Sequence, residues 1–142
     1  MGAKMPYRYE TTVKLYDTDA AGIMFFANYF RAGHDAYQAY LESCGFSFAR
    51  VLDEGKLLIP IVHAEADYFQ PLVVGDRLTI ILTCTTISTH SFVLNFELQR
   101  ADKSVAGSVR TAHAMIDRAS NEKLPLPPLL RKALEKIYVE KS

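Results

Sequence analysis

Tryptophan is absent from this chain of 142 residues, cysteine occurs only twice, and neither sign of charge is in excess. Sixteen lysines and arginines balance sixteen aspartates and glutamates, so the charge does not favour binding to nucleic acid or to an anionic membrane. No apolar run approaches the roughly 20 residues that a transmembrane helix needs. The N-terminal residues also lack the apolar core of a signal peptide. We therefore expect a cytoplasmic protein with no membrane or nucleic-acid partner.

The chain also lacks the patterns of several large enzyme classes. It contains no G-x-S-x-G elbow, no G-x-G-x-x-G turn and no P-loop. Its histidines are isolated, without the H-x-H or H-x-x-x-H spacing of a zinc site. The two cysteines, Cys44 and Cys84, fall in an apolar helical pattern and a strand pattern, so they are interpreted as buried thiols and not as a disulfide. We expect no metal and no cofactor.

The most informative stretch is residues 16–31, YDTDAAGIMFFANYFR. Asp17 and Asp19 flank a threonine, and the small residues that follow allow a tight bend because Gly22 can adopt a positive φ. An aromatic run then opens a predicted helix whose first N–H groups have no helical acceptor and carry the positive end of the helix dipole. A carboxylate next to such N–H groups is suited to acyl transfer. The alternative is that these aspartates only cap the helix.

Hydrophobic periodicity predicts an α+β protein. A long apolar helix over 26–44 is followed by a connector at 46–58, which contains a possible helical turn ended by Gly55, and then by strands of period two. In the strand over 59–70, Ile61, His63 and Glu65 are expected on one face, and small residues are expected against the helix. We predict one antiparallel sheet around one central helix in a single domain, 1–142. The remaining expected elements are strands at 7–15, 77–87, 91–100 and 105–117 and a short C-terminal helix at 129–140.

The string D-T-D-x-A-G followed by N-Y-F resembles the signature of the 4-hydroxybenzoyl-CoA thioesterase branch of the hotdog-fold superfamily. Other segments are similar to the 1,4-dihydroxy-2-naphthoyl-CoA thioesterases within that branch, which serve phylloquinone and menaquinone synthesis. The resemblance implies hydrolysis of an aromatic acyl-CoA by an α+β hotdog domain. The segments that carry it are 34–37, 59–71, 75–78, 88–92 and 125–127.

The resemblance also implies roles for particular residues. Asp19 corresponds to the catalytic carboxylate, and the backbone N–H of Phe26 corresponds to the oxyanion donor. Some relatives carry a histidine beside the aspartate loop that this chain lacks, so His63 is our first candidate for histidine assistance, with a structural role as the alternative; His34 is expected to have no catalytic duty. Further candidates are Gly22 and Tyr29 for the substrate, and His90, Ser91 and Arg110 for the CoA phosphates.

In the family the active site lies at a dimer interface, where two sheets join edge to edge, and tetramers are common. We therefore expect a homodimer or homotetramer. The alternatives are a thioesterase of other specificity, for 4-hydroxybenzoyl-CoA or short-chain acyl-CoA, and a non-catalytic acyl-CoA-binding hotdog protein. An acyl dehydratase on the same fold would use a catalytic histidine in a different setting, and the aspartate string disfavours it.

Overall fold

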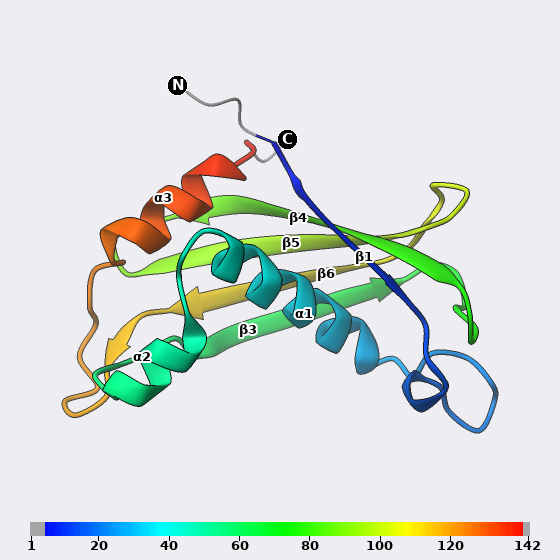
Figure 1. The fold of residues 1–142 in the computed structure, drawn as a ribbon, viewed down its shortest axis with the longest axis horizontal. Helices are drawn as coiled ribbons and strands as arrows, with labels where there is room; N and C mark the ends of the chain where they lie inside the picture. Colours follow the sequence, from blue (N-terminus) through cyan, green and yellow to red (C-terminus); the bar gives the residue numbers. More distant parts are fainter. Residues whose placement is uncertain (1–4, 141–142) are drawn as a thin grey trace.

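A five-stranded antiparallel sheet forms the body of the protein in the computed structural model, which describes residues 5–140 (Figure 1). The predicted absence of a signal peptide and the two ends of the predicted domain 1–142 concern residues that lie outside this range. The strand order is β1-β4-β5-β6-β3, so that β1 and β3 are the edges. The strands are β1 (Tyr7–Thr12), β3 (Ile61–Tyr68), β4 (Arg77–Ile87), β5 (Ser91–Arg100) and β6 (Val105–Ala114).

The inner face of the sheet forms the core because its strands alternate with period two. In β5, Phe92, Leu94, Phe96 and Leu98 are buried, while the residues between them are partly exposed. In β4 the alternate residues from Leu78 to Cys84 are buried in the same way. Both faces were predicted correctly from the alternation of residue types.

Helix α1 (Asn28–Ser43) lies along this inner face (Figure 1). Its approach to the sheet is close: a Cβ atom added to Gly33 would lie 3.1 Å from the Phe96 ring. On the strand side, a Cβ atom added to Gly107 would lie 2.8 Å from the Tyr29 ring. The helix therefore approaches the sheet most closely at positions where a glycine, which has no side chain, leaves room. This arrangement confirms the prediction of an antiparallel sheet around one central helix.

The smaller elements correct several predicted boundaries. The first strand ends at Thr12 and not at residue 15, because a 3-10 turn occupies Leu15–Asp17. The predicted helical turn before Gly55 is helix α2 (Phe48–Glu54). The predicted strand over 105–117 is split, and β7 (Ile116–Asp117) pairs with β2 (Leu57–Leu58) in a separate two-stranded sheet. The last helix, α3 (Pro128–Lys136), is shorter than predicted.

Strand β3 contains a bulge that changes which side chains share a face. The register shifts between Ile61 and His63, so that Ile61 lies opposite His113 and His63 lies opposite Ala112. Directly paired residues project to the same face, and His113 is buried against the helix. The prediction that Ile61 and His63 share a face is therefore wrong, because a bulge inserts one extra residue that the alternation of residue types does not reveal.

Among residues 5–140, no helix is long and apolar enough to cross a membrane.

Candidate active site

The loop between β1 and α1 folds into a tight turn around Asp19. The Asp19 N–H donates to the carbonyl of Ile23, and the Gly22 N–H donates to the carbonyl of Asp19, each at 2.9 Å. Gly22 has a φ of 80°, as the sequence predicted, and this left-handed conformation is the one that favours glycine. The loop thus carries Asp19 to the N-terminal end of α1.

Asp17 holds the loop through its carboxylate and its backbone. Its Oδ2 accepts the Lys14 N–H at 2.9 Å, which caps the 3-10 turn. Its backbone carbonyl accepts the Phe25 N–H at 2.9 Å and the side-chain amide of Asn28 at 2.8 Å. Every one of these contacts is internal to the loop and the start of the helix, so the geometry gives Asp17 a structural role.

Asp19 lines a cleft of about 450 Å³ at the start of α1, which we call the Asp19 cleft. One carboxylate oxygen of Asp19, Oδ1, accepts the Ala21 N–H at 2.8 Å. This hydrogen bond holds the side chain in place and uses only one of its two oxygens. The Phe26 N–H lies just before the helix and donates to no backbone group of residues 5–140. The cleft is lined by Asp19, Ile23, Met24, Phe25, Phe26, Tyr29, Tyr68, Phe69, Gln70 and Pro71.

Tyr68, at the end of β3, belongs to this cleft although the sequence did not single it out. Its hydroxyl donates to the Phe26 carbonyl at 3.2 Å. Its ring packs edge-on against Tyr29, with 4.7 Å between the ring centroids. The one feature of the sequence that could have identified Tyr68 is an aromatic residue at the end of a strand that also contains Ala64 and Ala66. Tyr68 therefore ties β3 to the residues that present the Phe26 N–H.

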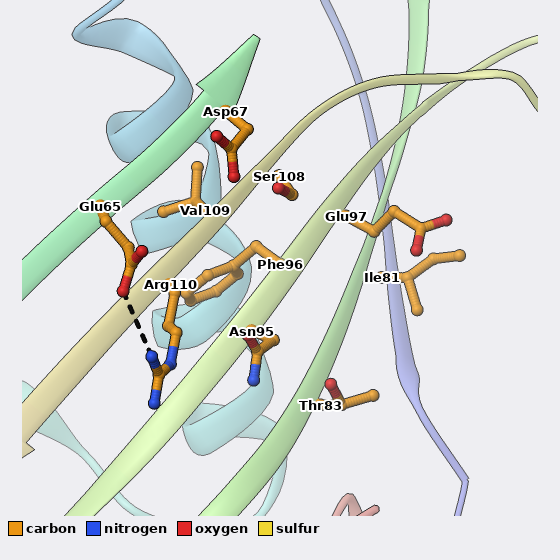
Figure 2. Close-up of a pocket in the computed structure, with 10 residues that line it drawn as sticks. All are labelled: Glu65, Asp67, Ile81, Thr83, Asn95, Phe96, Glu97, Ser108, Val109 and Arg110. Carbon is orange, nitrogen blue, oxygen red and sulfur yellow. Dashed lines mark hydrogen bonds and ion pairs between the residues drawn. The ribbon is translucent and has the colours of Figure 1, made fainter. Parts of the chain in front are cut away.

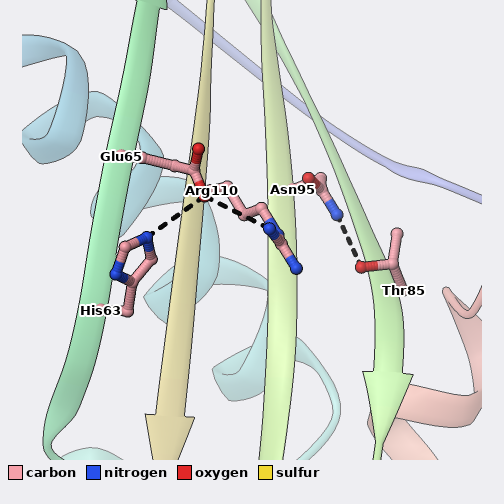
Figure 3. Close-up of polar contacts among 5 residues, drawn as sticks. All are labelled: His63, Glu65, Thr85, Asn95 and Arg110. Atoms are coloured by element: carbon pink, nitrogen blue, oxygen red, sulfur yellow. Dashed lines mark hydrogen bonds and ion pairs between the residues drawn. The ribbon is translucent and has the colours of Figure 1, made fainter. Parts of the chain in front are cut away.

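Arg110 lies on the opposite, outer face of the sheet (Figure 2). His63 lies on the same outer face, because it pairs with Ala112 and not with the buried His113. Glu65 bridges them: its Oε1 lies 3.2 Å from His63 Nε2 and 3.2 Å from an Arg110 guanidinium nitrogen (Figure 3). A separate groove of about 300 Å³ on that face includes Glu65 and Arg110 but neither Asp19 nor His63. Within one protomer the structure therefore does not bring His63 or Arg110 to the Asp19 cleft, and their predicted roles stay predictions.

The turn at 88–91 joins β4 to β5 and holds the two other candidates for CoA binding. The hydroxyls of Ser88 and Ser91 hydrogen bond to each other at 2.5 Å. His90 has a buried Nδ1 with no hydrogen-bond partner among residues 5–140. Arg131 of α3, which was not among the predicted candidates, donates to the Ser88 carbonyl at 2.7 Å. The structure thus adds a guanidinium to the predicted turn.

A second cavity, of about 420 Å³, lies between α1 and the strands β3 and β6; we call it the α1–β3 cavity. Its floor contains Tyr37, Thr111 and His113, all buried, and its rim contains the exposed residues His34 and Ile61. Burial, together with the charge of His34, lowers the pKa of His113 to about 4. His113 is therefore neutral at pH 7. Nothing in the sequence pattern distinguishes His113 from the other isolated histidines.

Acidification should destabilise the protein through His113. The unfolded chain takes up a proton near pH 6.5 and the native chain only near pH 4, so stability falls as the pH decreases between these values. Between pH 7 and pH 4.5 the free energy of unfolding should fall by about 2 kcal/mol on this account. Urea denaturation at both pH values should show this loss reduced in His113→Phe and retained in the exposed-site control His63→Gln. Equal pH dependence in wild type and His113→Phe would contradict the assignment.

Comparison with known proteins agrees with this fold. The model of the thioesterase-like superfamily matches residues 13–134. A 1,4-dihydroxy-2-naphthoyl-CoA hydrolase from Synechocystis is 35% identical over 122 residues, covering 85% of this chain and 88% of that protein. The crystal structure of a Synechocystis 1,4-dihydroxy-2-naphthoyl-CoA thioesterase superposes with a TM-score of 0.88 at 34% identity, covering 91% of this chain and 95% of that one. A gentisyl-coenzyme A thioesterase superposes with a TM-score of 0.80 at 28% identity, covering 90% and 99%.

The sheet around one helix, together with these relatives, defines a thioester hydrolase of the hotdog type. The chain belongs to the thioesterase-like superfamily.

Proposed function

We propose that the protein hydrolyses an aromatic acyl-CoA, 1,4-dihydroxy-2-naphthoyl-CoA, to 1,4-dihydroxy-2-naphthoate and CoA. The observation that carries the proposal is the Asp19 cleft, where a carboxylate meets the start of a helix among aromatic side chains. The similarity to hydrolases named for this substrate supports the choice of acyl group. The proposal treats residues 1–142 as one domain and places the enzyme in phylloquinone or menaquinone synthesis. A cytoplasmic location stays a prediction.

The proposed reaction needs only residues of this chain and water. Asp19 either takes a proton from water as the water attacks the thioester carbonyl or attacks that carbon itself, with water cleaving the resulting anhydride. The Phe26 N–H stabilises the oxyanion as the tetrahedral intermediate forms, helped by the positive end of the α1 dipole. Collapse of the intermediate breaks the C–S bond and releases the CoA thiolate. In the general-base route the thiolate takes the proton that Asp19 accepted from water, and in the anhydride route the water that cleaves the anhydride supplies this proton.

We further propose that two protomers join through β3. Two hydrogen bonds show which residues of β3 turn their backbone N–H and C=O groups toward β6. The Phe69 N–H donates to the Ala106 carbonyl, and the Ala114 N–H donates to the Pro60 carbonyl. By the alternation of an antiparallel ladder, the backbone groups of Glu65 then face β6 and those of Ala66 face the open edge. This edge also exposes apolar side chains, and Val62 is 64% exposed. An open, apolar edge of this kind is suited to pairing with a second copy.

A two-fold axis near the middle of β3 brings the Tyr68 end of each strand beside the Ile61 end of the other. Tyr68 lines the Asp19 cleft, and Ile61 lines the α1–β3 cavity. In the proposed dimer each Asp19 cleft therefore opens beside the α1–β3 cavity of the partner subunit. The CoA phosphates are assigned to the turn at 88–91, with His90, Ser91 and the neighbouring Arg131 as candidates and Arg110 as a further one.

Thiol release from a panel of acyl-CoAs tests the proposed function. We expect kcat/KM for 1,4-dihydroxy-2-naphthoyl-CoA to exceed that for octanoyl-CoA, because aromatic rings line both the Asp19 cleft and the α1–β3 cavity that adjoins it in the proposed dimer, and such rings pack well against an aryl group. A ratio below one would contradict the proposed acyl group. No release of thiol from any acyl-CoA, together with binding of acyl-CoA, would instead indicate the non-catalytic alternative.

A further inference from the structure

Strand β3 is exposed on both of its faces as well as along its open edge. Every residue of Ile61–Tyr68 except Ala66 is exposed, whereas the neighbouring strand β6 has no exposed residue. A strand that is uncovered in this way is suited to pairing with another strand. In the dimer proposed above, the partner strand is β3 of a second copy, so the side chains of β3 meet copies of themselves.

The outer face of β3 carries ionisable side chains at alternate positions: His63, Glu65 and Asp67. Glu65 Oε1 lies 3.2 Å from both His63 Nε2 and an Arg110 guanidinium nitrogen (Figure 3). Asp67 lines the outer groove with Glu65 and Arg110, and its carboxylate makes no hydrogen bond or ion pair with residues 5–140 (Figure 2). The remaining charged residue of that groove, Glu97, belongs to β5, two strands or about 10 Å from β3. The middle of the open edge therefore offers an imidazole and an unpaired carboxylate to a partner strand.

Two registers give the longest pairing between β3 and its copy. Residues 63–68 form the regular part of the strand, because the bulge lies just before them and the strand ends at Tyr68. Within this stretch the backbone groups of the even-numbered residues face the open edge, so they must pair with one another, and the two-fold axis passes through a single residue position. An axis at Glu65 or at Ala66 leaves the longest regular ladder, and an axis at any other position pairs fewer of these residues.

The charges distinguish the two registers. With the axis at Ala66, Glu65 lies directly opposite the partner's Asp67, twice in each dimer. With the axis at Glu65, His63 lies opposite the partner's Asp67, also twice, and Glu65 meets only its own copy. Directly opposed side chains have Cβ atoms about 5 Å apart, where like charges destabilise the pair and opposite charges stabilise it. The ion pair with Arg110 offsets the single contact between the two copies of Glu65. The charges therefore favour the axis at Glu65.

We propose that His63 and Asp67 form a reciprocal contact across the dimer interface, with Glu65 at the two-fold axis. Each imidazole then lies between Glu65 of its own strand and the partner's Asp67. Two carboxylates beside one imidazole favour the protonated ring, in which both nitrogens donate. This contact rests on the dimer that the proposed function includes, and it assigns His63 to subunit pairing and not to catalysis. It keeps the Tyr68 end of each strand beside the Ile61 end of the other, as the proposed shared site requires.

Disulfide cross-linking tests the position of the axis. Directly paired residues have Cα atoms about 4.5–5.5 Å apart, within the range that a disulfide spans. All variants carry Cys44→Ala, which removes the partly exposed native cysteine. Under mild oxidation Glu65→Cys should form a disulfide with its own copy and give a covalent dimer on a non-reducing gel. Asp67→Cys should not, because its copy lies four residues, or about 14 Å, further along the ladder.

Combinations of two cysteines complete the test of the register. His63→Cys together with Asp67→Cys should give a covalent dimer, because each cysteine then lies opposite the other type in the partner. A covalent dimer in Glu65→Cys/Asp67→Cys but not in Glu65→Cys would place the axis at Ala66 and overturn the contact. The absence of cross-links in all of these variants would overturn it as well.

Exchange of the two charges tests the contact itself. His63→Asp places carboxylates opposite each other at both symmetric contacts, so the dissociation constant of the dimer should rise by roughly tenfold or more. Addition of Asp67→His restores an imidazole opposite each carboxylate and should return the constant close to that of wild type. Sedimentation over a dilution series measures these constants.

Arg8→Asp is the matched control for the exchange. Arg8 is exposed on β1, the other edge of the sheet, so this variant makes a larger charge change away from the proposed interface. The dissociation constant should stay that of wild type. Equal weakening by Arg8→Asp would overturn the contact, and so would a double variant His63→Asp/Asp67→His that dissociates as readily as His63→Asp.

These measurements need no substrate, so they separate failure of the contact from failure of the proposed reaction. A dimer that cross-links through Glu65→Cys and recovers on charge exchange, but hydrolyses no acyl-CoA, would support the contact and overturn only the reaction. A wild type that is an active monomer at micromolar concentration would overturn the contact together with the proposed shared site.

Discussion

Replacement of Asp19 by Asn should lower kcat by roughly 10²–10⁴-fold, because loss of a positioned general base has that effect. The loss should be larger still if Asp19 is the nucleophile. The variant keeps an oxygen that can accept the Ala21 N–H, so the turn around Asp19 should persist. KM should change little, because the lost interaction acts in the transition state. Steady-state kinetics with a thiol reagent give both constants.

Asp17→Asn is the matched control, because it makes the same chemical change two residues away. The Asp17 carboxylate caps the 3-10 turn by accepting the Lys14 N–H and lines a different cleft from Asp19. We expect kcat within about tenfold of wild type and a small decrease in melting temperature, because asparagine keeps an oxygen that can accept the Lys14 N–H but loses the charge that strengthens this hydrogen bond. The assignment is reversed if Asp17→Asn abolishes turnover while Asp19→Asn keeps it. If neither variant loses activity, the carboxylate mechanism is wrong.

The fold could be predicted from the sequence because its strongest signals are local. The alternation of Phe92, Leu94, Phe96 and Leu98 specifies a half-buried strand without information from the rest of the chain. The small residues of the loop likewise specify a turn, and Gly22 has the predicted positive φ. The features that were missed depend on contacts between distant segments. The bulge at Ile61 and the split of the last strand at Met115 are set by which strands pair, and single-strand periodicity does not report this.

The residues of the candidate site also fall into those that local sequence could identify and those that depend on contacts between distant segments. Asp19 and the Phe26 N–H lie within eight consecutive residues, so a motif was enough to place them together. Tyr68 and Arg131 reach their positions through the tertiary fold, by contacts to Phe26 and Ser88. His63 was selected by residue type alone, and the fold places it with Glu65 on the outer face.

Proline at position 66 should convert the protein to a monomer. The Ala66 N–H is assigned to the open edge of β3, so proline there removes a donor to a partner strand without removing a bond to β6. The 16.0 kDa chain should then give the mass of a single chain by light scattering at micromolar concentration, where wild type should give a dimer or tetramer. Far-UV circular dichroism should show that the sheet persists.

The same variant should lose activity, because the proposed site combines the Asp19 cleft of one protomer with the α1–β3 cavity of its partner. We expect kcat/KM to fall by roughly 10²-fold or more, the effect of losing the groups that orient a substrate. Ala66→Ser, which retains the N–H, should keep both the oligomer and the activity. Glu65→Pro, whose lost N–H faces β6, should instead lower the melting temperature, because it breaks the β3–β6 ladder. A fully active monomer in Ala66→Pro would show that each protomer carries a complete site, and an unchanged oligomer would show that β3 is not the interface.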